Sequence, residues 1–266
     1  MSDQTGVTVE TLGHSLLEQF DGLEAETVTV PFVDTVDKAQ RLASAIDDEA
    51  ETSGVRPVVF ASLVQESVRM ALRSCRGLVL DFFDAFLAPL EVEFERQSSN
   101  TLRSDHGVLD SKDYNSRIEA TNYALAADDG HAPDYYDRAD VILIGVSRSG
   151  KTPTCLYLAL QYGVFAANYP LTGDELETGR LPRTLEAYRQ NLYGLTISPE
   201  RLRQIRLERR TSGRYASAQQ VSFELRAAEA LFRRLGIRSI DTTHSSVEEI
   251  ASKILSDTGL ERRLRG

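Results

Sequence analysis

The chain has 266 residues, of which 41% are hydrophobic and 26% are charged, a balance typical of a globular protein with a sizeable core. Its 30 Lys and Arg residues against 40 Asp and Glu residues give a net charge of -10, which argues against extensive binding to nucleic acid. No apolar run approaches the ~20 residues that a membrane-spanning helix needs, and no signal peptide opens the sequence. We therefore expect a cytoplasmic protein that does not act at a membrane.

The first part of the chain alternates apolar, β-branched segments with helical patterns. Strands are predicted at 26–33, 56–63 and 77–83, and helices at 37–51 and 65–74. Strands that alternate with helices usually pair in parallel, because each helix returns the chain to the same end of the sheet. We predict a Rossmann-like parallel sheet region and assign it to an N-terminal α/β domain of residues 1–95.

A polar stretch follows at 96–114, rich in Ser and Asp and without clear periodicity, and it is typical of a linker or mobile loop. A helix is predicted at 114–126, and Asp128, Asp129 and Gly130 come directly after it. Asp and Gly commonly end a helix in a turn, but a carboxylate here could also act as a general base or as a metal partner. These residues alone leave both readings open, and we assign 96–138 to a connector.

The remainder, 139–266, repeats the alternation of strands and helices. Strands are predicted at 139–146, 164–169, 192–197 and 237–241, and helices at about 150–162, 199–210, 216–234 and 246–259. The last helix opens on Ser246 with Glu248 and Glu249 in its first turn, as helix starts prefer. This pattern predicts a second α/β domain.

The segment "GVSRSGKT" at 145–152 has the spacing G-x-x-x-x-G-K-T of a phosphate-binding loop. It follows an apolar strand pattern and opens a helical one, so its backbone N–H groups can surround a phosphate. We expect the nucleotide phosphates to be bound by Gly145, Val146, Ser147, Arg148, Ser149, Gly150, Lys151 and Thr152. Lys151 would neutralise the terminal phosphate oxygens as a catalytic residue, and the Thr152 hydroxyl would bind Mg²⁺. The second domain is accordingly predicted to be P-loop kinase-like.

Two other features permit more than one reading. Arginines gather in "RLRQIRLERR" at 201–210, which fits either a solvated helix face or a segment that contacts phosphate. Cys75 and Cys155 stand in apolar surroundings without metal-ligand spacing, so we expect reduced thiols and leave a disulfide as the alternative.

Several of these segments together resemble the bacterial phosphoenolpyruvate synthase regulatory proteins. The resemblance is carried by "SDQTGVTVETLGHSLLEQF" (2–20), "YNSRIEATNYALAADDG" (114–130), "ADVILIGVSRSGKTPTCLYLALQYGVFAANYPLT" (139–172), "LYGLTISPERLRQIRLERR" (192–210) and "THSSVEEIASKIL" (243–255). These segments occur in the family's order and cover nearly the whole chain. The resemblance is therefore much more specific than the phosphate loop alone.

The resemblance implies a bifunctional enzyme. Its members use ADP to phosphorylate a threonine of phosphoenolpyruvate synthase, which inactivates the synthase, and they remove the phosphoryl group with inorganic phosphate and release pyrophosphate. Carried over by position, the loop would bind ADP, and the family's Asp-Asp-Gly falls on Asp128, Asp129 and Gly130. Asp129 would then be the catalytic base, and the basic segment after Pro199 would contact phosphate or act as a lid. The implied cofactors are ADP, phosphate and Mg²⁺, and a homo-oligomer is left open.

The sequence also departs from the family. Met1 directly precedes Ser2 where the family has a hydrophobic strand, so we expect either a missing first strand or a start site assigned too late. Gln4 replaces a glycine, and Ala127 stands where the family has a histidine. Two alternative functions stay open: an ATP-dependent small-molecule P-loop kinase, and a nucleotide-sensing regulator without chemistry of its own.

Overall fold

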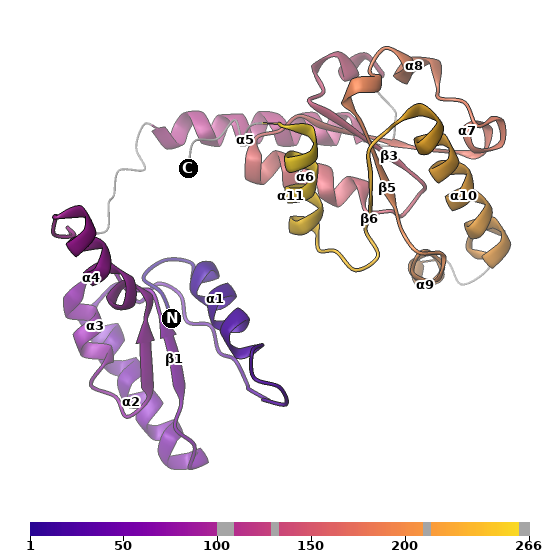
Figure 1. Ribbon diagram of the computed structural model, residues 1–266. Helices are drawn as coiled ribbons and strands as arrows, with labels where there is room; N and C mark the ends of the chain where they lie inside the picture. The colour runs from indigo at the N-terminus through magenta and orange to yellow at the C-terminus, as the bar shows by residue number, and fades with distance from the viewer. Residues whose placement is uncertain (100–108, 129–132, 210–213, 261–266) are drawn as a thin grey trace. The chain divides into compact units, whose positions relative to one another are not determined.

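The computed structural model describes residues 1–99, 109–128, 133–209 and 214–260 (Figure 1). The chain divides into two compact units, Met1–Ser104 and Asp105–Gly266. Both units combine helices with parallel strands, which confirms the predicted mixed α/β class. In the described parts of the chain, no helix has both the length and the apolar character needed to cross a membrane.

The first unit is built around two short parallel strands. Its elements are α1 (Val7–Leu17), α2 (Val36–Ser53), β1 (Val58–Ala61), α3 (Glu66–Leu72), β2 (Leu78–Asp81) and α4 (Phe82–Phe94). Strand β1 pairs with β2 in parallel, and Ser2 adds a parallel bridge to Ser62 beyond the end of β1. The small core between strands and helices contains Val33, Ala39, Ile46, Val59, Ala61, Leu63, Val68 and Leu72.

The strand predicted at 26–33 is wrong, because the structure assigns no strand to these described residues. The segment is hydrogen-bonded to the N-terminus at only a few places: Ser2 N–H donates to the Val30 carbonyl, and Phe32 and Val33 N–H donate to the carbonyls of Gln4 and Ser2. Phe32 also has a positive φ of 57°, which interrupts an extended conformation. An apolar, β-branched segment forms a strand only where a neighbouring strand supplies a continuous series of backbone hydrogen bonds.

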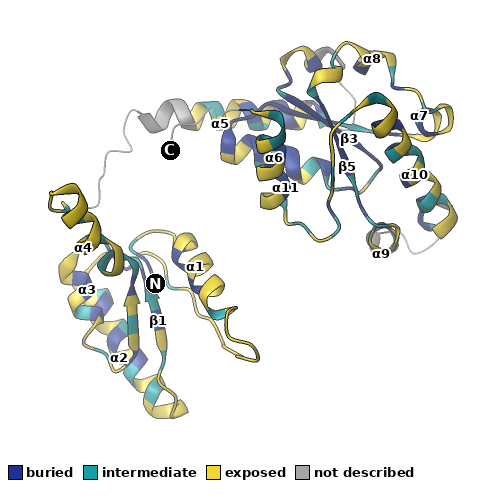
Figure 2. Ribbon diagram, in the orientation of Figure 1, coloured by how far each residue is buried: buried dark blue, intermediate teal, exposed yellow. Residues whose placement is uncertain are grey.

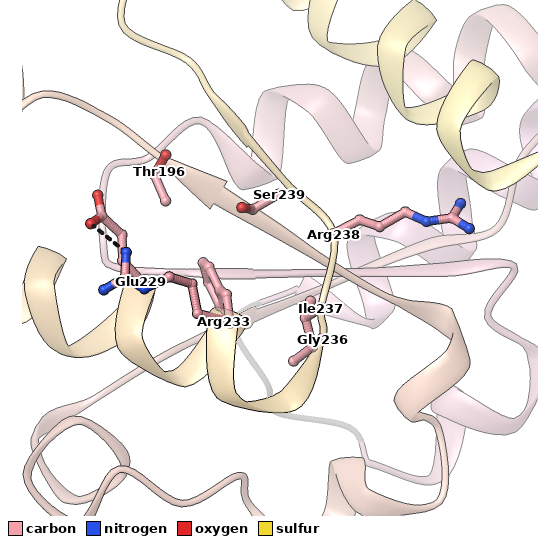
Figure 3. Close-up of a pocket in the computed structure, with 8 residues that line it drawn as sticks. Thr196, Glu229, Arg233, Gly236, Ile237, Arg238 and Ser239 are labelled. Atoms are coloured by element: carbon pink, nitrogen blue, oxygen red, sulfur yellow. Dashed lines mark ion pairs between the residues drawn. The ribbon is translucent and has the colours of Figure 1, made fainter.

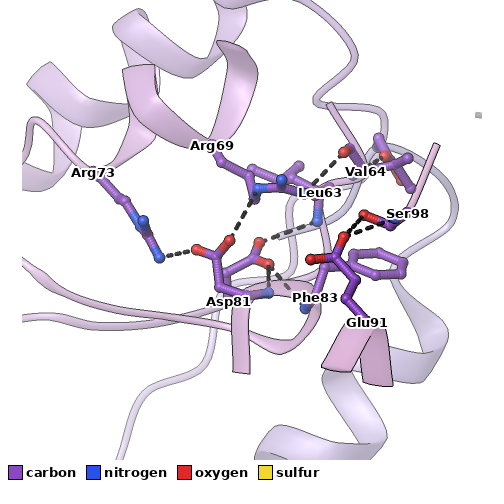
Figure 4. A network of polar contacts seen from close by, with 10 residues as sticks. Leu63, Val64, Arg69, Arg73, Asp81, Phe83, Glu91 and Ser98 are labelled. Atoms are coloured by element: carbon purple, nitrogen blue, oxygen red, sulfur yellow. Dashed lines mark hydrogen bonds and ion pairs between the residues drawn. The ribbon is translucent and has the colours of Figure 1, made fainter. Parts of the chain in front are cut away.

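The third predicted strand also ends earlier than expected, because Asp81 starts a helix. Its carboxylate accepts hydrogen bonds from the N–H groups of Phe83 and Asp84 and so caps the N-terminus of α4. Helix α4 itself was not predicted from the sequence. Asp81 also accepts from the Leu63 N–H just beyond β1 (Figure 4). Burial raises the pKa of the Asp81 carboxyl above its ordinary value. The residue therefore joins the carboxyl ends of the two strands.

A buried arginine completes this network in the first unit. The Arg69 guanidinium donates to the carbonyl oxygens of Leu63 and Val64, both at 2.8 Å, and lies 3.3 Å from the Asp84 carboxylate (Figure 4). Arg73 forms a second ion pair with Asp84. Because these polar groups bind one another and the backbone, the network stabilises the strand ends and leaves little capacity for a ligand.

The second unit contains a four-stranded parallel sheet. Its elements are α5 (Leu109–Ala126), η2 (Pro133–Arg138), β3 (Val141–Gly145), α6 (Lys151–Tyr162), β4 (Ala166–Pro170), α7 (Gly173–Thr178), α8 (Arg183–Glu186), η3 (Arg189–Asn191), β5 (Leu192–Thr196), α9 (Pro199–Arg209), η4 (Arg214–Ala216), α10 (Ala218–Leu235), β6 (Ser239–Asp241) and α11 (Val247–Thr258). The strand order is β4-β3-β5-β6, and every pair is parallel. The four strands predicted for this part of the chain are thereby confirmed to within two residues at each end.

Helices cover this sheet and form the main core. Helix α6 packs against α5, α11 and the strands β3 and β4, while α10 packs against α7, α9 and β5. All five residues of β3 are buried, and in Figure 2 the central strands are dark blue between helices whose outer faces are yellow. Helix α10 buries Val221, Leu225, Ala228, Leu231 and Phe232, a spacing of three and four residues that places them on one face.

Helix α5 starts five residues before the helix predicted at 114–126, inside the stretch that was expected to be a linker. Helices α7 and α8 were not predicted either, since they are too short to show a helical period. The prediction of reduced thiols fits the structure, where Cys75 and Cys155 are both free. Burial in α6 raises the pKa of the Cys155 thiol, so this group stays neutral and acts as a core side chain.

Candidate functional site

The glycine-rich loop, Gly145–Thr152, connects β3 to α6 at the point where the order of strand addition in the sheet reverses. From β3 the chain proceeds outward to β4, and it then returns to the other side of β3 to form β5 and β6. In parallel sheets, ligands bind at the carboxyl ends of the strands beside such a change of direction. The topology therefore places the loop where an α/β sheet ordinarily binds its ligand.

Gly145 ends β3 and leaves no space for a side chain. A Cβ atom at this residue would lie 2.5 Å from the carbonyl oxygen of Leu195 on β5 and 2.9 Å from the Ser149 Oγ. The Gly145 carbonyl also accepts a hydrogen bond from the Leu171 N–H at 2.9 Å, which joins the loop to the end of β4. Glycine is required here because the backbone of β5 approaches the loop closely.

Gly145→Ala is expected to lower the free energy of unfolding of the second unit by about 1–3 kcal/mol, because the contact with the β5 backbone cannot be relieved by a side-chain rotation. Gly173→Ala is the matched control, since a Cβ at Gly173 meets no atom within 4 Å and this residue has no positive φ. Urea unfolding of both variants measures the difference. Equal stability of the two variants would contradict the close approach at Gly145.

One side chain of the loop and two from distant parts of the chain hold the backbone of the loop. Three loop carbonyl oxygens accept hydrogen bonds: Val146 from Lys151 at 2.9 Å, Ser147 from Arg206 at 3.1 Å and Ser149 from Thr242 at 3.3 Å. In a trans peptide the N–H points opposite to the carbonyl of the same peptide unit, and the described residues contain no cis peptide bond. The three bonds therefore also fix the directions of the N–H groups that follow.

The predicted loop residues differ in accessibility. Gly145, Val146, Ser149 and Lys151 are buried, Ser147, Gly150 and Thr152 are partly exposed, and Arg148 is exposed. Arg148 and Gly150 have positive φ values of 76° and 92°, so the backbone turns sharply before α6. The N-terminus of α6 and the positive charge of Lys151, its first residue, both favour an anion at this end of the helix.

An oxygen-rich cluster lies beside the loop, at Thr152. The Thr152 hydroxyl donates to the Asp128 carboxylate at 3.0 Å, and the Asn168 amide donates both to the Thr152 Oγ1 at 2.9 Å and, through a short hydrogen bond, to Asp128. Asn168 lies on β4, and its backbone N–H donates to the Ala127 carbonyl. The end of α5 is thus attached to β4, which brings Asp128 to the loop.

The Asn168 side chain was not singled out by the sequence, although it is only 1% exposed. Its Oδ1 has no hydrogen-bond donor among the described residues. Carboxylate, hydroxyl and amide oxygens are ligands that Mg²⁺ prefers, and here the Asn168 amide faces Asp128 and Thr152 through its nitrogen. An Asn in a five-residue strand gives no signal of this role in the sequence, because β4 brings it to Thr152 only after the sheet has formed.

The second candidate carboxylate, Asp129, lies outside the described residues, as do Gly130 and His131. Its predicted role as catalytic base therefore stays a prediction. Asp128 is described, and its contacts with Thr152 and Asn168 favour the functional reading of this segment over a simple turn.

The arginine-rich segment forms α9 and presents its arginines on different sides. Arg201 and Arg203 are exposed, whereas Arg206 is fully buried and contacts the loop backbone. Leu202, four residues before Arg206, is also fully buried. The sequence could not separate Arg206 from its neighbours, because a buried Arg and a solvated Arg leave the same charge pattern.

A concave region lies at the end of α10, with a volume of about 450 Å³ (Figure 3). Its lining includes Thr196, Arg233, Arg238 and Ser239, and Arg233 forms an ion pair with Glu229 at 3.6 Å. Much of this lining precedes β6, at the amino end of that strand, whereas ligands of parallel sheets bind at the carboxyl ends. The glycine-rich loop is therefore the better candidate site.

Comparisons with known proteins show the family of this chain. The model of the kinase/pyrophosphorylase family matches residues 1–255. A protein of Alkalilimnicola ehrlichii is 52% identical over 264 residues, covering 99% of this chain and 96% of that protein. A protein of Ectopseudomonas mendocina is 50% identical over 265 residues, covering 100% of this chain and 97% of that protein. Both carry the name "Putative phosphoenolpyruvate synthase regulatory protein". With a family model that covers nearly its whole length and relatives that are half identical to it, this chain belongs to the kinase/pyrophosphorylase family.

Proposed function

We propose that this protein transfers the β-phosphoryl group of ADP to a threonine of phosphoenolpyruvate synthase and also removes that group with inorganic phosphate. Phosphorylation yields phosphothreonine and AMP. Phosphorolysis of the phosphothreonine by inorganic phosphate yields pyrophosphate and the free threonine. The observation that carries the proposal is the joint position of Lys151, Thr152, Asp128 and Asn168 at one end of α6, in a chain of the kinase/pyrophosphorylase family. The names of the full-length relatives support the synthase as the protein substrate.

The glycine-rich loop would act as a P-loop that binds the ADP phosphates. Lys151 supplies the positive charge, and the loop N–H groups supply donors for the phosphate oxygens. Lys151 lies inside the loop, with its ammonium 2.9 Å from the Val146 carbonyl, so a short movement of a flexible side chain would transfer it to a phosphate oxygen. A preorganised set of donors is what phosphoryl transfer requires, because charge spreads over the phosphoryl oxygens in the transition state.

Thr152, Asp128 and Asn168 would hold Mg²⁺, which neutralises part of the phosphate charge when it is bound. The Asp128 carboxylate and the Thr152 hydroxyl are in contact, and the Asn168 amide nitrogen faces both of them, so a rotation of that amide would turn its buried Oδ1 toward the ion and give it a partner. Asp129 would accept the proton of the threonine hydroxyl as that oxygen attacks the β-phosphorus. In phosphorolysis a phosphate oxygen attacks the phosphothreonine phosphorus instead, and the threonine oxygen leaves with a proton. Both directions use the same loop.

Mass spectrometry of purified phosphoenolpyruvate synthase tests this proposal after incubation with this protein, Mg²⁺ and ADP. We expect a mass increase of one phosphoryl group on a threonine, with one AMP formed per modified threonine. Subsequent addition of phosphate without ADP should remove the group and release pyrophosphate. AMP formation without phosphothreonine would contradict the proposed acceptor.

Two other outcomes would favour the alternatives. A small-molecule kinase would consume ATP in place of ADP and would leave the synthase unmodified. A nucleotide-sensing regulator would bind ADP and the synthase but would form neither AMP nor phosphothreonine. Melting temperatures measured with ADP, ATP and AMP add a binding readout that is independent of turnover.

A further inference from the structure

The Arg206 side chain extends from α9 into the interior of the second unit, and its residue is 0% exposed. Its Nη1 donates to the Tyr215 carbonyl at 2.9 Å, and its Nη2 donates to the Ser147 carbonyl at 3.1 Å and to the Glu224 carboxylate at 2.7 Å. The guanidinium carbon lies 4.2 Å from the centre of the Tyr215 ring. The arginine is thus directed at protein groups, including the backbone of the glycine-rich loop.

A second contact joins the same two segments. The hydroxyl groups of Ser147 and Tyr215 lie 2.9 Å apart and share a hydrogen bond. Ser147 is therefore held through both its carbonyl and its side chain, by residues that are 59 and 68 positions further along the chain. The residue that follows Ser147 is Arg148, whose φ is positive. The two attachments therefore hold the backbone directly before this turn.

A buried guanidinium needs a specific reason, because its removal from water is costly and an apolar side chain would fill the same volume. Glu224 balances the charge, and the ring of Tyr215 covers one face of the guanidinium. Only the planar fork of an arginine can donate to the carbonyls of two separate segments and to a carboxylate at the same time. A lysine in this position carries its charge on a single nitrogen and lacks the planar, branched set of donors that contacts the three acceptors.

We propose that Arg206 is a positioning residue that fixes the peptide unit between Ser147 and Arg148, so that the Arg148 N–H is presented to a phosphate bound by the loop. The carbonyl of this unit points toward α9, and its N–H consequently points away from α9. Tyr215 and Glu224 hold Arg206 in place. This role rests on the proposed function of the loop as a phosphate site and adds the group that sets its geometry.

Arg206→Lys tests the proposal, with Arg226→Lys as the matched control on the exposed side of α10, outside the basic segment after Pro199. Hydrogen exchange of loop peptides that span 145–152 reports the order of the backbone, and calorimetry with pyrophosphate and with ADP reports binding. We expect Arg206→Lys to exchange faster in the loop and to bind pyrophosphate roughly tenfold more weakly, the loss expected for one misplaced hydrogen-bond donor. Helix α11 should keep its protection, and Arg226→Lys should match the wild type in every measurement.

Unchanged loop exchange and unchanged pyrophosphate affinity in folded Arg206→Lys would overturn the proposal, even if the melting temperature fell. If Arg206→Lys does not fold, Tyr215→Phe decides instead, because it keeps the ring on the guanidinium and removes the hydroxyl from Ser147. We expect this variant to increase loop exchange and weaken pyrophosphate binding, and the absence of both effects would overturn the proposal. If the wild type binds neither pyrophosphate nor ADP, the proposed function fails, while the exchange data still decide whether Arg206 orders the loop.

Discussion

Lys151→Ala is expected to slow both the ADP-dependent phosphorylation and the phosphorolysis by about 10²–10³-fold, the usual effect of removing one group that stabilises charge in a transition state. The two directions should suffer alike, because the same phosphoryl group passes through the same loop in each. Rates of AMP formation and of pyrophosphate formation, measured with purified synthase, give the comparison.

The fold is expected to survive this change. The Lys151 ammonium binds the Val146 carbonyl of its own loop, and Ala is a good residue at the first position of a helix. Lys253→Ala is the control, since Lys253 lies exposed on α11 and pairs only with its neighbour Asp257 among the contacts described for it. Normal phosphorylation by a folded Lys151→Ala protein would remove this residue from the catalytic site.

Asp128→Asn and Asp129→Asn are expected to have different effects, although the two residues are adjacent. Asp128 contacts Thr152 and Asn168, so its replacement should raise the Mg²⁺ concentration needed for half-maximal rate by about 10–100-fold and slow both directions. Asp129, as the base, should matter mainly for the attack of the threonine hydroxyl, with a loss of about 10²-fold or more in the kinase direction. Phosphate is already partly ionised at neutral pH and depends less on a general base, so the rate of phosphorolysis should fall less than the rate of phosphorylation.

The measurement is a Mg²⁺ titration of both rates for each variant, with ADP affinity as a check on binding. Asp174→Asn serves as the control, because Asp174 is exposed in the first turn of α7. Equal losses in both directions for Asp129→Asn would assign this residue to metal binding or structure. A Mg²⁺ dependence that is unchanged by Asp128→Asn would contradict the oxygen cluster at Thr152.

The sequence by itself determined the features that depend on neighbouring residues. The run from 139 to 146 is apolar throughout and predicts a buried strand, and the spacing of Gly145, Gly150, Lys151 and Thr152 predicts a strand-to-helix turn suited to phosphate. The alternation of strands and helices predicts parallel pairing, which the two sheets confirm. The predictions of the buried strand, of the turn into a helix and of the parallel pairing succeed because hydrophobic period and turn chemistry are local properties of a chain, while phosphate binding by the turn stays a prediction.

Only the tertiary structure decided which distant groups complete the site. Asn168, Arg206 and Thr242 reach the loop from β4, from α9 and from the residue after β6, and each of them is an ordinary residue in its own segment. The tertiary structure likewise decided against a strand at 26–33, whose short partner at the N-terminus supplies few hydrogen bonds. Side chains such as Arg206 acquire a role only when packing brings them to a backbone group far away in the sequence, because burial then makes an unpaired polar group costly.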